Sequence, residues 1–514
     1  MIYQLKDIFE QVIDDAIFNK YYDTKKAECD FIKTLPRNKK RIGLLKLAGT
    51  DNILWDKIKK IHSSDGTKYS KVKSIIVLLR DYVKTVDVSK KEHGEVLTPF
   101  NELAKPMINL MDKYDDAFWG NPKNKVLDSS AGYGTFLILC LYKFMEGLSN
   151  YVDDNGSSII EITKRGETKC YDLSIEDERL KYVIEQQLYY GELQSKSVFS
   201  WLVAIDIYDE YDANIYWGSY LEEGFDFHMK NVWCVEKFDL IIQNPPYQTR
   251  QEGNRKSQAL WHLFVQKSLD ILNENGYMIM VHPSGWRNVD GLFKETQKKL
   301  KERQILELHI FDEKDGMKIF GAETRFDFYI LSNKKCYSET LIKCQDGTFE
   351  SLNLSNMDFI PNGMFKMFES LIAKDSDERV RVISDSSYHT QRPHLCKNDD
   401  MDFKYPCVYT VKSGDILTLW YSNTNSNGHF GIPKMIWSNF RISSAGSFID
   451  SAGVFGLTQF SYAIVDDEDT LIKIKKAFDT SKFRRMMETC SVGDMSINRK
   501  VIATFRKEFW KEFI

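Results

Sequence analysis

Residues 238–247 read FDLIIQNPPY, an apolar run that stops abruptly at an amide, two prolines and an aromatic ring. The apolar part has the length and composition of a buried β-strand, and Asn244, Pro245, Pro246 and Tyr247 follow at its carboxyl end. Ligands of open α/β sheets bind beyond the carboxyl ends of the strands. The stretch therefore predicts an α/β fold in which this strand brings Asn244 to a ligand.

The chemistry of this strand end suits an amino group. Neither proline can donate a backbone hydrogen bond, but both keep their carbonyls, so the turn is a rigid rim of acceptors beside the Asn244 amide oxygen. Tyr247 adds a flat face on which a base can stack. Acceptors at Asn244 and the Pro245 carbonyl would hold both hydrogens of an aromatic amine and free its lone pair to attack a sulfonium methyl group. The alternative is that Asn-Pro-Pro only ends the strand as a turn.

A second motif lies upstream, where residues 126–136 read VLDSSAGYGTF and predict a strand, a tight turn and the start of a helix. Gly132 and Gly134 let the backbone approach a ligand, and the exposed amides of a helix start suit a carboxylate. Asp128, at the strand end, can accept from an amino group. A dinucleotide-binding loop is the rival interpretation, but the third glycine of that fingerprint is missing.

Two further polar residues are candidates for the same site. Asp172 ends an expected strand at 168–172, where a carboxylate would bind ribose hydroxyls, with residues 150–167 as a surface insertion before it. Thr98 precedes Pro99 and is expected to cap a helix, which would place another polar edge near the glycine turn. The alternatives are a solvent-exposed aspartate and a cap with no other role.

The rest of the chain predicts three regions: a helical segment at 1–90, a βα-repeating and largely parallel sheet at 91–344, and a loop-rich α+β domain at 345–514. One helix in the middle region has an apolar face from Leu260 to Leu272 and is expected to end at Asn275-Gly276. The expected strands of the middle region are 125–128, 168–172, 214–217, 238–243, 277–281, 306–311 and 326–331.

Composition narrows the class of protein. The 514 residues carry a net charge of -4, so binding to nucleic acid would depend on local basic clusters such as Arg250, Arg255 and Lys256. The nine cysteines include no C-x-x-C pair, which indicates neither a disulfide framework nor a metal site and favours a reducing cytoplasm. We expect no signal peptide, no transmembrane segment and no membrane partner.

Taken in chain order, Thr98-Pro99, Asp128 to Gly134, Asp172 and Asn244 to Tyr247 resemble the gamma group of N6-adenine DNA methyltransferases of restriction-modification systems. The resemblance covers roughly residues 91–335. It implies a Rossmann-like methyltransferase sheet, S-adenosylmethionine as cofactor, double-stranded DNA as substrate, and a target recognition domain at 345–514. The residues that it implies are Thr98, Asp128, Ala131, Gly132, Gly134, Asp172 and Phe264 for cofactor binding, and Asn244, Pro245, Pro246 and Tyr247 for catalysis, with no metal.

The resemblance also implies that the target adenine is extruded from the duplex. Phe320 is the candidate for the aromatic ring that packs on this base, while Ser219 stands where the family has an acidic contact to the cofactor adenine. Residue types suited to DNA contacts in the C-terminal region are Arg392, His394, Lys412, Asn423, Asn425, Asn427, His429, Lys434 and Arg441.

Other functions are compatible with the same motifs. An Asn-Pro-Pro-Tyr rim can present a protein glutamine or an RNA base, and a non-catalytic DNA-specificity subunit can keep the fold. The large C-terminal region favours DNA, and the intact residues 244–247 favour an enzyme. Residues 1–90 contain no convincing nuclease motif, so a restriction endonuclease would be a separate partner.

Overall fold

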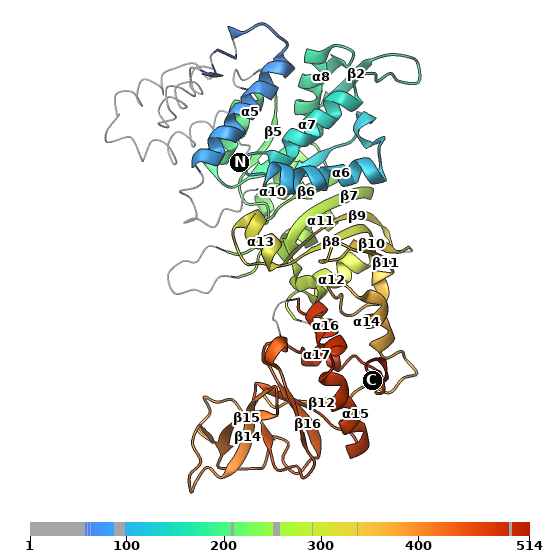
Figure 1. Ribbon diagram of the computed structural model, residues 1–514. Coiled ribbons are helices and arrows are strands. Elements are labelled where there is room, and N and C mark those ends of the chain that lie inside the picture. The colour runs from blue at the N-terminus through green and yellow to red at the C-terminus, as the bar shows by residue number, and fades with distance from the viewer. Residues whose placement is uncertain are drawn as a thin grey trace, which may run out of the picture. The chain divides into compact units, whose positions relative to one another are not determined.

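The computed structural model describes residues 57–58, 60–61, 63–86, 98–206, 210–249, 258–289, 291–336, 338–492 and 496–514. The chain divides into two compact units. The first unit comprises Met1–Pro283, Lys299–Leu308 and Asp312–Ser338, and the second comprises Ser284–Lys298, His309–Phe311 and Glu339–Ile514. In Figure 1 the described elements of the first unit run from blue to yellow, and most of the second unit is orange and red.

The first unit is built on a part of the nine-stranded mixed sheet, and this part has the strand order β8-β9-β7-β6-β1-β4-β5. Neighbouring strands from β7 through β6, β1 and β4 to β5 are parallel, and β9 is antiparallel to β7. The strands are β1 Val126–Asp128, β4 Leu188–Glu192, β5 Asn214–Trp217, β6 Phe238–Gln243, β7 Leu272–Pro283, β8 Arg303–Phe311 and β9 Phe326–Lys335. The predicted α/β class is confirmed.

Helices alternate with these strands, as Figure 1 shows. Those before β4 are α5 Lys68–Val86, η4 Phe100–Ala104, α6 Lys105–Tyr114, η5 Phe118–Gly120, α7 Thr135–Gly147, α8 Glu176–Tyr182 and η6 Val183–Gln187. Those after β4 are α9 Ser195–Ile205, α10 Glu223–Asn231, α11 Trp261–Asp270, η7 Ser284–Arg287, α12 Lys294–Lys301 and α13 Glu313–Phe320. Helix α5 is the described part of the predicted N-terminal helical segment.

One predicted strand lies outside the central sheet. Residues 168–172 do form a strand, β3 Glu167–Asp172, but it pairs antiparallel with β2 Ile159–Lys164 in a separate two-stranded sheet. The prediction that this strand belongs to the largely parallel sheet is wrong, and the strand beside β1 is β4. Strand β4 is buried along its whole length, as a parallel strand covered on both faces must be, whereas β2 and β3 are mostly exposed.

Two predicted helix ends also differ. Thr98 caps no helix, because Pro99 is the N-cap residue of η4 and makes no side-chain cap hydrogen bond. Helix α11 ends at Asp270, and Asn275-Gly276 lie inside β7 rather than at a helix end. Residues 150–167, expected to be a surface insertion, include β2 and so form part of a hairpin.

The second unit contains both strands and helices, and it includes the residues 345–514 for which an α+β domain is predicted. It contains two four-stranded sheets, with the orders β12-β19-β16-β17 and β13-β15-β14-β18. A core that includes Val408, Ile436 and Ala463 packs between strands of both sheets. The strands are β10 Thr340–Lys343, β11 Phe349–Leu352, β12 Val382–Ile383, β13 Leu395–Cys396, β14 Tyr405–Lys412, β15 Ile416–Ser422, β16 Lys434–Ser438, β17 Ser447–Asp450, β18 Gly456–Leu457 and β19 Ser461–Ile464. The helices are η8 Leu354–Asn356, α14 Phe365–Leu371, η9 Ile442–Ser444, α15 Glu468–Phe478, α16 Ser481–Thr489, α17 Arg499–Ile502 and η10 Phe509–Glu512.

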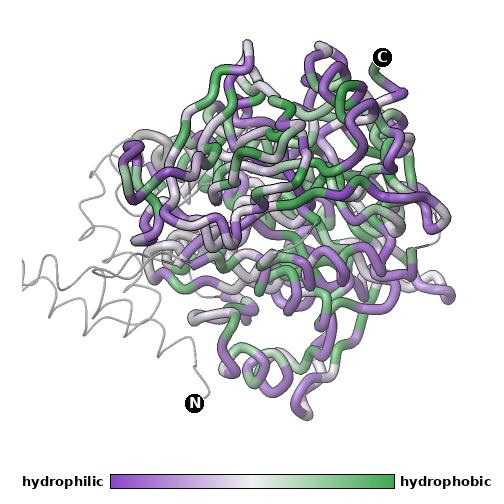
Figure 2. Tube along the Cα trace, turned by 90° about the horizontal axis from the view of Figure 1, so that it is seen from below, coloured by the Kyte–Doolittle hydropathy of each residue, from purple (hydrophilic) through white to green (hydrophobic). Residues whose placement is uncertain are grey.

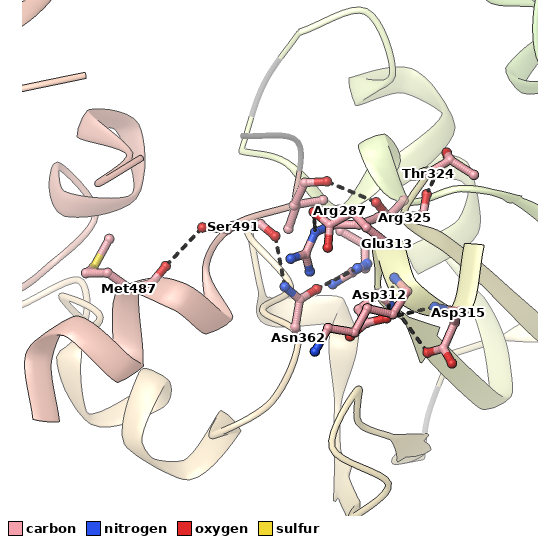
Figure 3. Close-up of polar contacts among 12 residues, drawn as sticks. Arg287, Asp312, Glu313, Asp315, Thr324, Arg325, Asn362, Met487 and Ser491 are labelled. Carbon is pink, nitrogen blue, oxygen red and sulfur yellow. Dashed lines mark hydrogen bonds and ion pairs between the residues drawn. The ribbon is translucent and has the colours of Figure 1, made fainter. Parts of the chain in front are cut away.

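Arg287 explains why residues 284–298 belong to the second unit although the sequence places them in the middle region. Its side chain is fully buried and donates to the carbonyls of Ile360 and Pro361 and, over 2.8 Å, to Oδ1 of Asn362. The Asn362 amide in turn donates to the Ser491 carbonyl (Figure 3). A buried guanidinium needs such partners, so the segment after β7 stays with the residues that supply them.

Hydrophobic and hydrophilic residues are interleaved along the described chain, as Figure 2 shows. Among the residues that the structure describes, no helix is long and apolar enough to cross a membrane.

Candidate active site

Asn244 follows β6 directly and is held from two sides. Its side-chain Nδ2 donates to Oγ1 of Thr98 over 3.2 Å, and its backbone carbonyl accepts from Oγ of Ser130 over 3.2 Å. The amide oxygen Oδ1 is buried and has no hydrogen-bond partner among the described residues. A buried acceptor without a partner is uncommon and destabilising, so it requires an explanation. Here the hydrogen bond to Thr98 fixes the orientation of the amide and leaves its oxygen without a partner among the described residues.

Tyr247 lies beside Phe320, the residue proposed from the sequence to pack on a base. The two rings meet edge to face, with centroids 6.1 Å apart and an interplanar angle of 85°. The Tyr247 hydroxyl is buried without a partner in the described part of the chain, and burial raises the pKa of this phenol well above its usual value. The Tyr247 backbone carbonyl accepts from the Leu260 N–H over 3.0 Å, which anchors the loop after Pro246.

Helix α13 presents Phe320 at its last position and is firmly anchored at its start. Asp312 accepts hydrogen bonds from the backbone N–H groups of Lys314 and Asp315, and the Asp315 carboxylate accepts from the Asp312 N–H (Figure 3). This is a capping box, which satisfies the free amides of a helix start. Hydrogen bonds therefore anchor both the loop that carries Tyr247 and the start of the helix that carries Phe320.

The glycine turn after β1 contacts two aromatic residues. Gly134 has φ +78°, and a Cβ placed there would come within 2.2 Å of the Trp201 ring. Trp201 is stacked on Tyr190 with centroids 5.3 Å apart, and the Tyr190 hydroxyl donates to the Gly132 carbonyl over 2.6 Å. At Gly132, which has φ +53°, an added Cβ would meet no described atom within 4 Å. One side of the turn is therefore packed, while the space that a Gly132 side chain would fill is open.

Asp128 is the last residue of β1, directly before this turn. Its side chain is buried, and one carboxylate oxygen accepts from the Ser130 N–H over 3.2 Å. Burial raises the pKa of Asp128 well above its usual value, and the nearby negative charge of Glu192 acts in the same direction. A cationic amino group close to this carboxyl would favour its ionised form. The Ala131 N–H is used within the protein, because it donates to the Gly191 carbonyl over 3.0 Å.

Glu192, which the sequence did not single out, occupies the place expected for Asp172. It ends β4 beside β1, and its Oε2 accepts from the Gly132 N–H over 2.8 Å. Its Oε1 accepts from the N–H groups of Leu193 and Gln194. The apolar run 188–192, LYYGE, ends in this acid and was the signal that could have identified it.

Asp172 is not brought together with the other candidates. It ends β3, outside the central sheet, and its Oδ1 accepts from the hydroxyl of Ser158 and from the N–H and hydroxyl of Ser174. These hydrogen bonds hold the pKa of Asp172 below its usual value. The Asp172 side chain thus stabilises the turn that leads into α8, and it does not lie at the carboxyl edge of the central sheet.

Phe264 and the loop after β5 complete the same edge of the sheet. Phe264, on α11, is buried against Tyr220 with ring centroids 5.2 Å apart. The Gly218 N–H donates to the backbone carbonyl of Glu192 over 3.0 Å, which ties the loop carrying Ser219 to the end of β4. Asp128, Ala131, Gly132 and Gly134 thus follow or end β1, and Phe264 lies on α11. Thr98 contacts the same edge through Asn244, and Asp172 does not lie there.

One candidate DNA contact in the second unit is ruled out by its burial. Lys434 is fully buried, and its ammonium group donates to the carboxylate of Asp450 and the carbonyl of Ile432, both over 3.0 Å. His429 is half-buried, with Nε2 3.2 Å from the Ser384 carbonyl. The exposed candidates are Arg392, Lys412, Asn423, Asn425, Asn427 and Arg441. The basic residues Arg250, Arg255 and Lys256 lie outside the described residues.

The parallel part of the sheet carries a glycine turn after β1 and an acid at the end of the adjacent β4, an arrangement of open α/β sheets that bind ligands beyond the carboxyl ends of their strands. Residues 154–320 match the family described as Eco57I restriction-modification methylase. This match includes β4, the residues Asn244 to Tyr247, and Phe320. The resemblance to N6-adenine methyltransferases of restriction-modification systems is confirmed.

Two curated relatives match parts of the chain. An uncharacterized adenine-specific methylase of Mycoplasma pneumoniae is 36% identical over 98 residues, which cover 18% of this chain and 22% of that protein. The type II restriction enzyme and methyltransferase RM.Eco57I of Escherichia coli is 26% identical over 149 residues, which cover 24% of this chain and 15% of that protein. The chain thus spans less than a quarter of the length of either relative.

Solved structures of restriction-modification proteins are also similar. A nuclease-deletion mutant of the type ISP restriction-modification enzyme LlaGI, in complex with a DNA substrate mimic, is 11% identical, with a TM-score of 0.48. The alignment covers 99% of this chain and 67% of that chain. A modification subunit of a putative type I restriction enzyme from Vibrio vulnificus YJ016 is 17% identical, covers 57% of this chain and 55% of that chain, and has a TM-score of 0.40.

Proposed function

We propose that this protein is a site-specific DNA methyltransferase that transfers a methyl group from S-adenosylmethionine to N6 of adenine. The observation that carries the proposal is the buried Oδ1 of Asn244, an acceptor without a partner among the described residues, at the carboxyl end of the sheet. An exocyclic amino group is a donor that would satisfy it. The matches to adenine-specific and restriction-modification methylases support the same substrate.

Asn244 and the Pro245 carbonyl would act on the amino group by accepting its two hydrogens. This holds the nitrogen lone pair in line for attack, which is a contribution of orientation and electrostatics. S-adenosylmethionine supplies an electrophilic methyl carbon, whose bond to sulfur breaks with its electron pair as the nitrogen–carbon bond forms. The amino group then loses one proton to solvent, so that atoms and charge balance.

The described residues fit this cofactor. The buried Asp128 carboxyl would face the amino group of the methionine part, and the open space beside Gly132, where an added Cβ meets no described atom within 4 Å, would admit that part. Glu192 would accept from the ribose hydroxyls, replacing Asp172 in that role, because it ends the strand next to β1. Phe264 and Tyr220 supply aromatic surface for the adenine, and Ser219 a hydroxyl.

The target adenine would be flipped out of the duplex, since its amino group is otherwise inside the base stack. Extrusion costs on the order of a few kcal/mol, which stacking and hydrogen bonds offset. Tyr247 offers a ring face beside Asn244, and Phe320 meets the edge of that ring. A base whose amino group reaches Asn244 would therefore lie against Tyr247.

The DNA duplex is the proposed partner, and residues 345–514 are the proposed target recognition domain. Exposed amides at Asn423, Asn425 and Asn427 are of the type that reads base edges, and Arg392 and Arg441 are of the type that binds phosphates. Among the similar solved structures, a type ISP and a type IIL restriction-modification enzyme are described as bound to DNA. A separate restriction endonuclease is the second proposed partner, and the cytoplasm the proposed location.

Two other functions remain as outcomes of the test. A methyltransferase acting on RNA or on a protein glutamine would use the same acceptor at Asn244. A non-catalytic specificity subunit would keep the fold and lose transfer. The available Asn244 oxygen favours an enzyme over the second of these.

The test incubates the full chain with tritiated S-adenosylmethionine and unmethylated genomic DNA, total RNA or cell protein. We expect label in DNA, with N6-methyladenine at one fixed sequence when the product is mapped by sequencing. Label confined to RNA or protein would overturn the substrate. No label in any substrate, with cofactor binding intact in equilibrium dialysis, would favour the non-catalytic subunit.

A further inference from the structure

Gln243, the last residue of β6, lies directly before Asn244 and is completely buried. Its side-chain oxygen accepts from Oγ of Ser129 over 2.6 Å, and its nitrogen donates to Oγ of Ser268 over 2.6 Å. Ser129 follows Asp128 at the start of the glycine turn. One amide therefore joins the strand that ends at Asn244 to the turn that would hold the methyl donor.

The hydrogen-bonded chain continues from Ser268, a buried residue of α11. Its hydroxyl lies 3.1 Å from the Tyr220 hydroxyl, which is also buried. Tyr220 is the ring against which Phe264 packs, in the loop after β5. The polar chain thus connects the carboxyl ends of β1, β5 and β6, and helix α11.

Such a chain is sensitive to the loss of any member. A buried polar group that loses its partner destabilises the fold, so the chain strongly favours one arrangement of the elements that it joins. An apolar residue before Asn244 would fill the same space in the core without linking to Ser129. The amide is therefore better explained by the relation between the strand end and the turn than by packing alone.

We propose that Gln243 is a positioning residue that holds the end of β6 and the glycine turn in one register, so that the Asn244 oxygen is aligned with the methyl donor. This inference rests on the proposed function and names a residue outside the set that the sequence singled out. Gln243 touches neither substrate. It acts through its backbone link to Asn244 and its side-chain contact with Ser129.

The main test compares Gln243→Met with a matched control, Gln187→Met. Gln187 is also fully buried in the first unit, and its amide donates to the carbonyls of Asn121, Pro122 and Asn124, at the amino end of β4. Both variants remove a buried amide of the same size. We expect Gln243→Met to lower kcat at least 10-fold while the Kd for S-adenosylmethionine changes less than 3-fold, since misplacement by about 1 Å can reduce rates about 100-fold.

Gln187→Met should lower the melting temperature to a similar degree and leave kcat within 2-fold. Equal losses of kcat in the two variants, or kcat within 2-fold of wild type in Gln243→Met, would overturn the inference. Ser129→Ala should lower kcat in the same direction, and adding it to Gln243→Met should cause little further loss, because the two residues share one contact.

Gln243→Glu adds a readout that a purely structural role would not give. When protonated, the introduced carboxyl presents an acceptor to Ser129 and a donor to Ser268, as the amide does. We expect its kcat to approach the wild-type value at low pH and to fall relative to wild type as the pH rises. A constant ratio across the pH range would contradict the positioning role.

Hydrogen exchange measured without DNA separates this inference from the proposed function. Gln243→Met should speed exchange of the backbone amides in residues 129–134 and 244–249, and Gln187→Met should not. Unchanged exchange in both segments would overturn the link between turn and strand end. If the wild-type protein methylates no DNA, but Gln243→Met still exchanges faster than wild type in these segments, the proposed function is refuted and the link between turn and strand end remains.

Discussion

The side-chain nitrogen of Asn244 donates to the hydroxyl oxygen of Thr98 over 3.2 Å, and these residues lie 146 positions apart in the chain. With the nitrogen held, the amide cannot rotate freely, and its oxygen stays buried without a partner among the described residues. Thr98 is therefore an orienting residue for the proposed acceptor rather than a helix cap. This relationship leads to the first two predictions.

Replacing Asn244 by Ala removes the acceptor that the proposed reaction needs. We expect Asn244→Ala to reduce kcat at least 100-fold, about the loss seen when one preorganised polar group is removed from an active site. The Kd for S-adenosylmethionine should stay within 3-fold, because the proposed cofactor contacts lie at the glycine turn and Glu192. Filter assays of tritium transfer and equilibrium dialysis measure the two quantities. Retained transfer would refute the role of Asn244.

Removing the Thr98 hydroxyl should have a smaller effect of the same kind. Thr98→Val keeps the shape of the side chain but no longer accepts from Asn244, so the amide can adopt orientations that do not reach the base. We expect a fall in kcat of about 5-fold, in line with a lost hydrogen bond of roughly 1 kcal/mol. Thr98→Ser is the control and should retain near wild-type kcat. If both variants behave alike, the hydroxyl has no orienting role.

Variants of Glu192 and Asp172 compare the acid that we propose from the structure with the acid that the sequence predicts as the ligand of the cofactor ribose. Glu192→Gln should weaken S-adenosylmethionine binding at least 10-fold, because a carboxylate accepts from ribose hydroxyls more strongly than an amide does. Asp172→Asn should change the Kd less than 2-fold, since Asp172 lies in the hairpin formed by β2 and β3. Calorimetric titration measures both. The opposite ranking would restore Asp172 as the cofactor ligand.

The glycine turn should tolerate no side chain at position 134. Gly134→Ala would place a methyl group 2.2 Å from the Trp201 ring at a backbone φ of +78°. Gly156 has a similar φ of +80° but meets no described atom within 4 Å, so Gly156→Ala is the control for backbone strain alone, which costs about 1 kcal/mol. We expect Gly134→Ala to destabilise more in urea denaturation and to weaken cofactor binding. Equal destabilisation would show that the Trp201 ring moves without cost.

Because His228 is buried, we expect the protein to lose stability in acid. It is buried on α10, and desolvation lowers its pKa to about 4, from 6.5 for an unperturbed histidine. Unfolding therefore takes up a proton between these values, and the free energy of unfolding falls as the pH drops through this window. The loss between pH 7 and pH 4 should be about 3 kcal/mol. His228→Phe should flatten this part of the pH profile in chemical denaturation, and an unchanged slope would contradict the assignment.

Local sequence was sufficient for the parts of the fold that a single segment specifies. The apolar run before Asn244 predicts β6 with its observed bounds, and residues 214–217 predict β5 equally well. The spacing of Gly132 and Gly134 predicts the turn after β1. In each case the alternation of apolar segments with turn residues determines the local conformation.

The partner of each strand was decided only in the tertiary structure. Residues 168–172 form a strand as predicted, but they pair with β2, and β4 takes the place beside β1. Strand pairing depends on hydrogen bonds to residues far away in the chain, and a short apolar run does not specify them. For this reason the sequence pointed to Asp172 and the structure to Glu192.

The sequence by itself determined the class of fold, the strand that ends at Asn244 and the chemical types present at its carboxyl edge, because these follow from local patterns. Only the tertiary structure decided which side chains meet there: Thr98 with Asn244, Glu192 with Gly132, and Gln243 with Ser129. Each of these contacts joins residues at least 60 positions apart. Such pairs form only after the strands have assembled, and no local pattern encodes them.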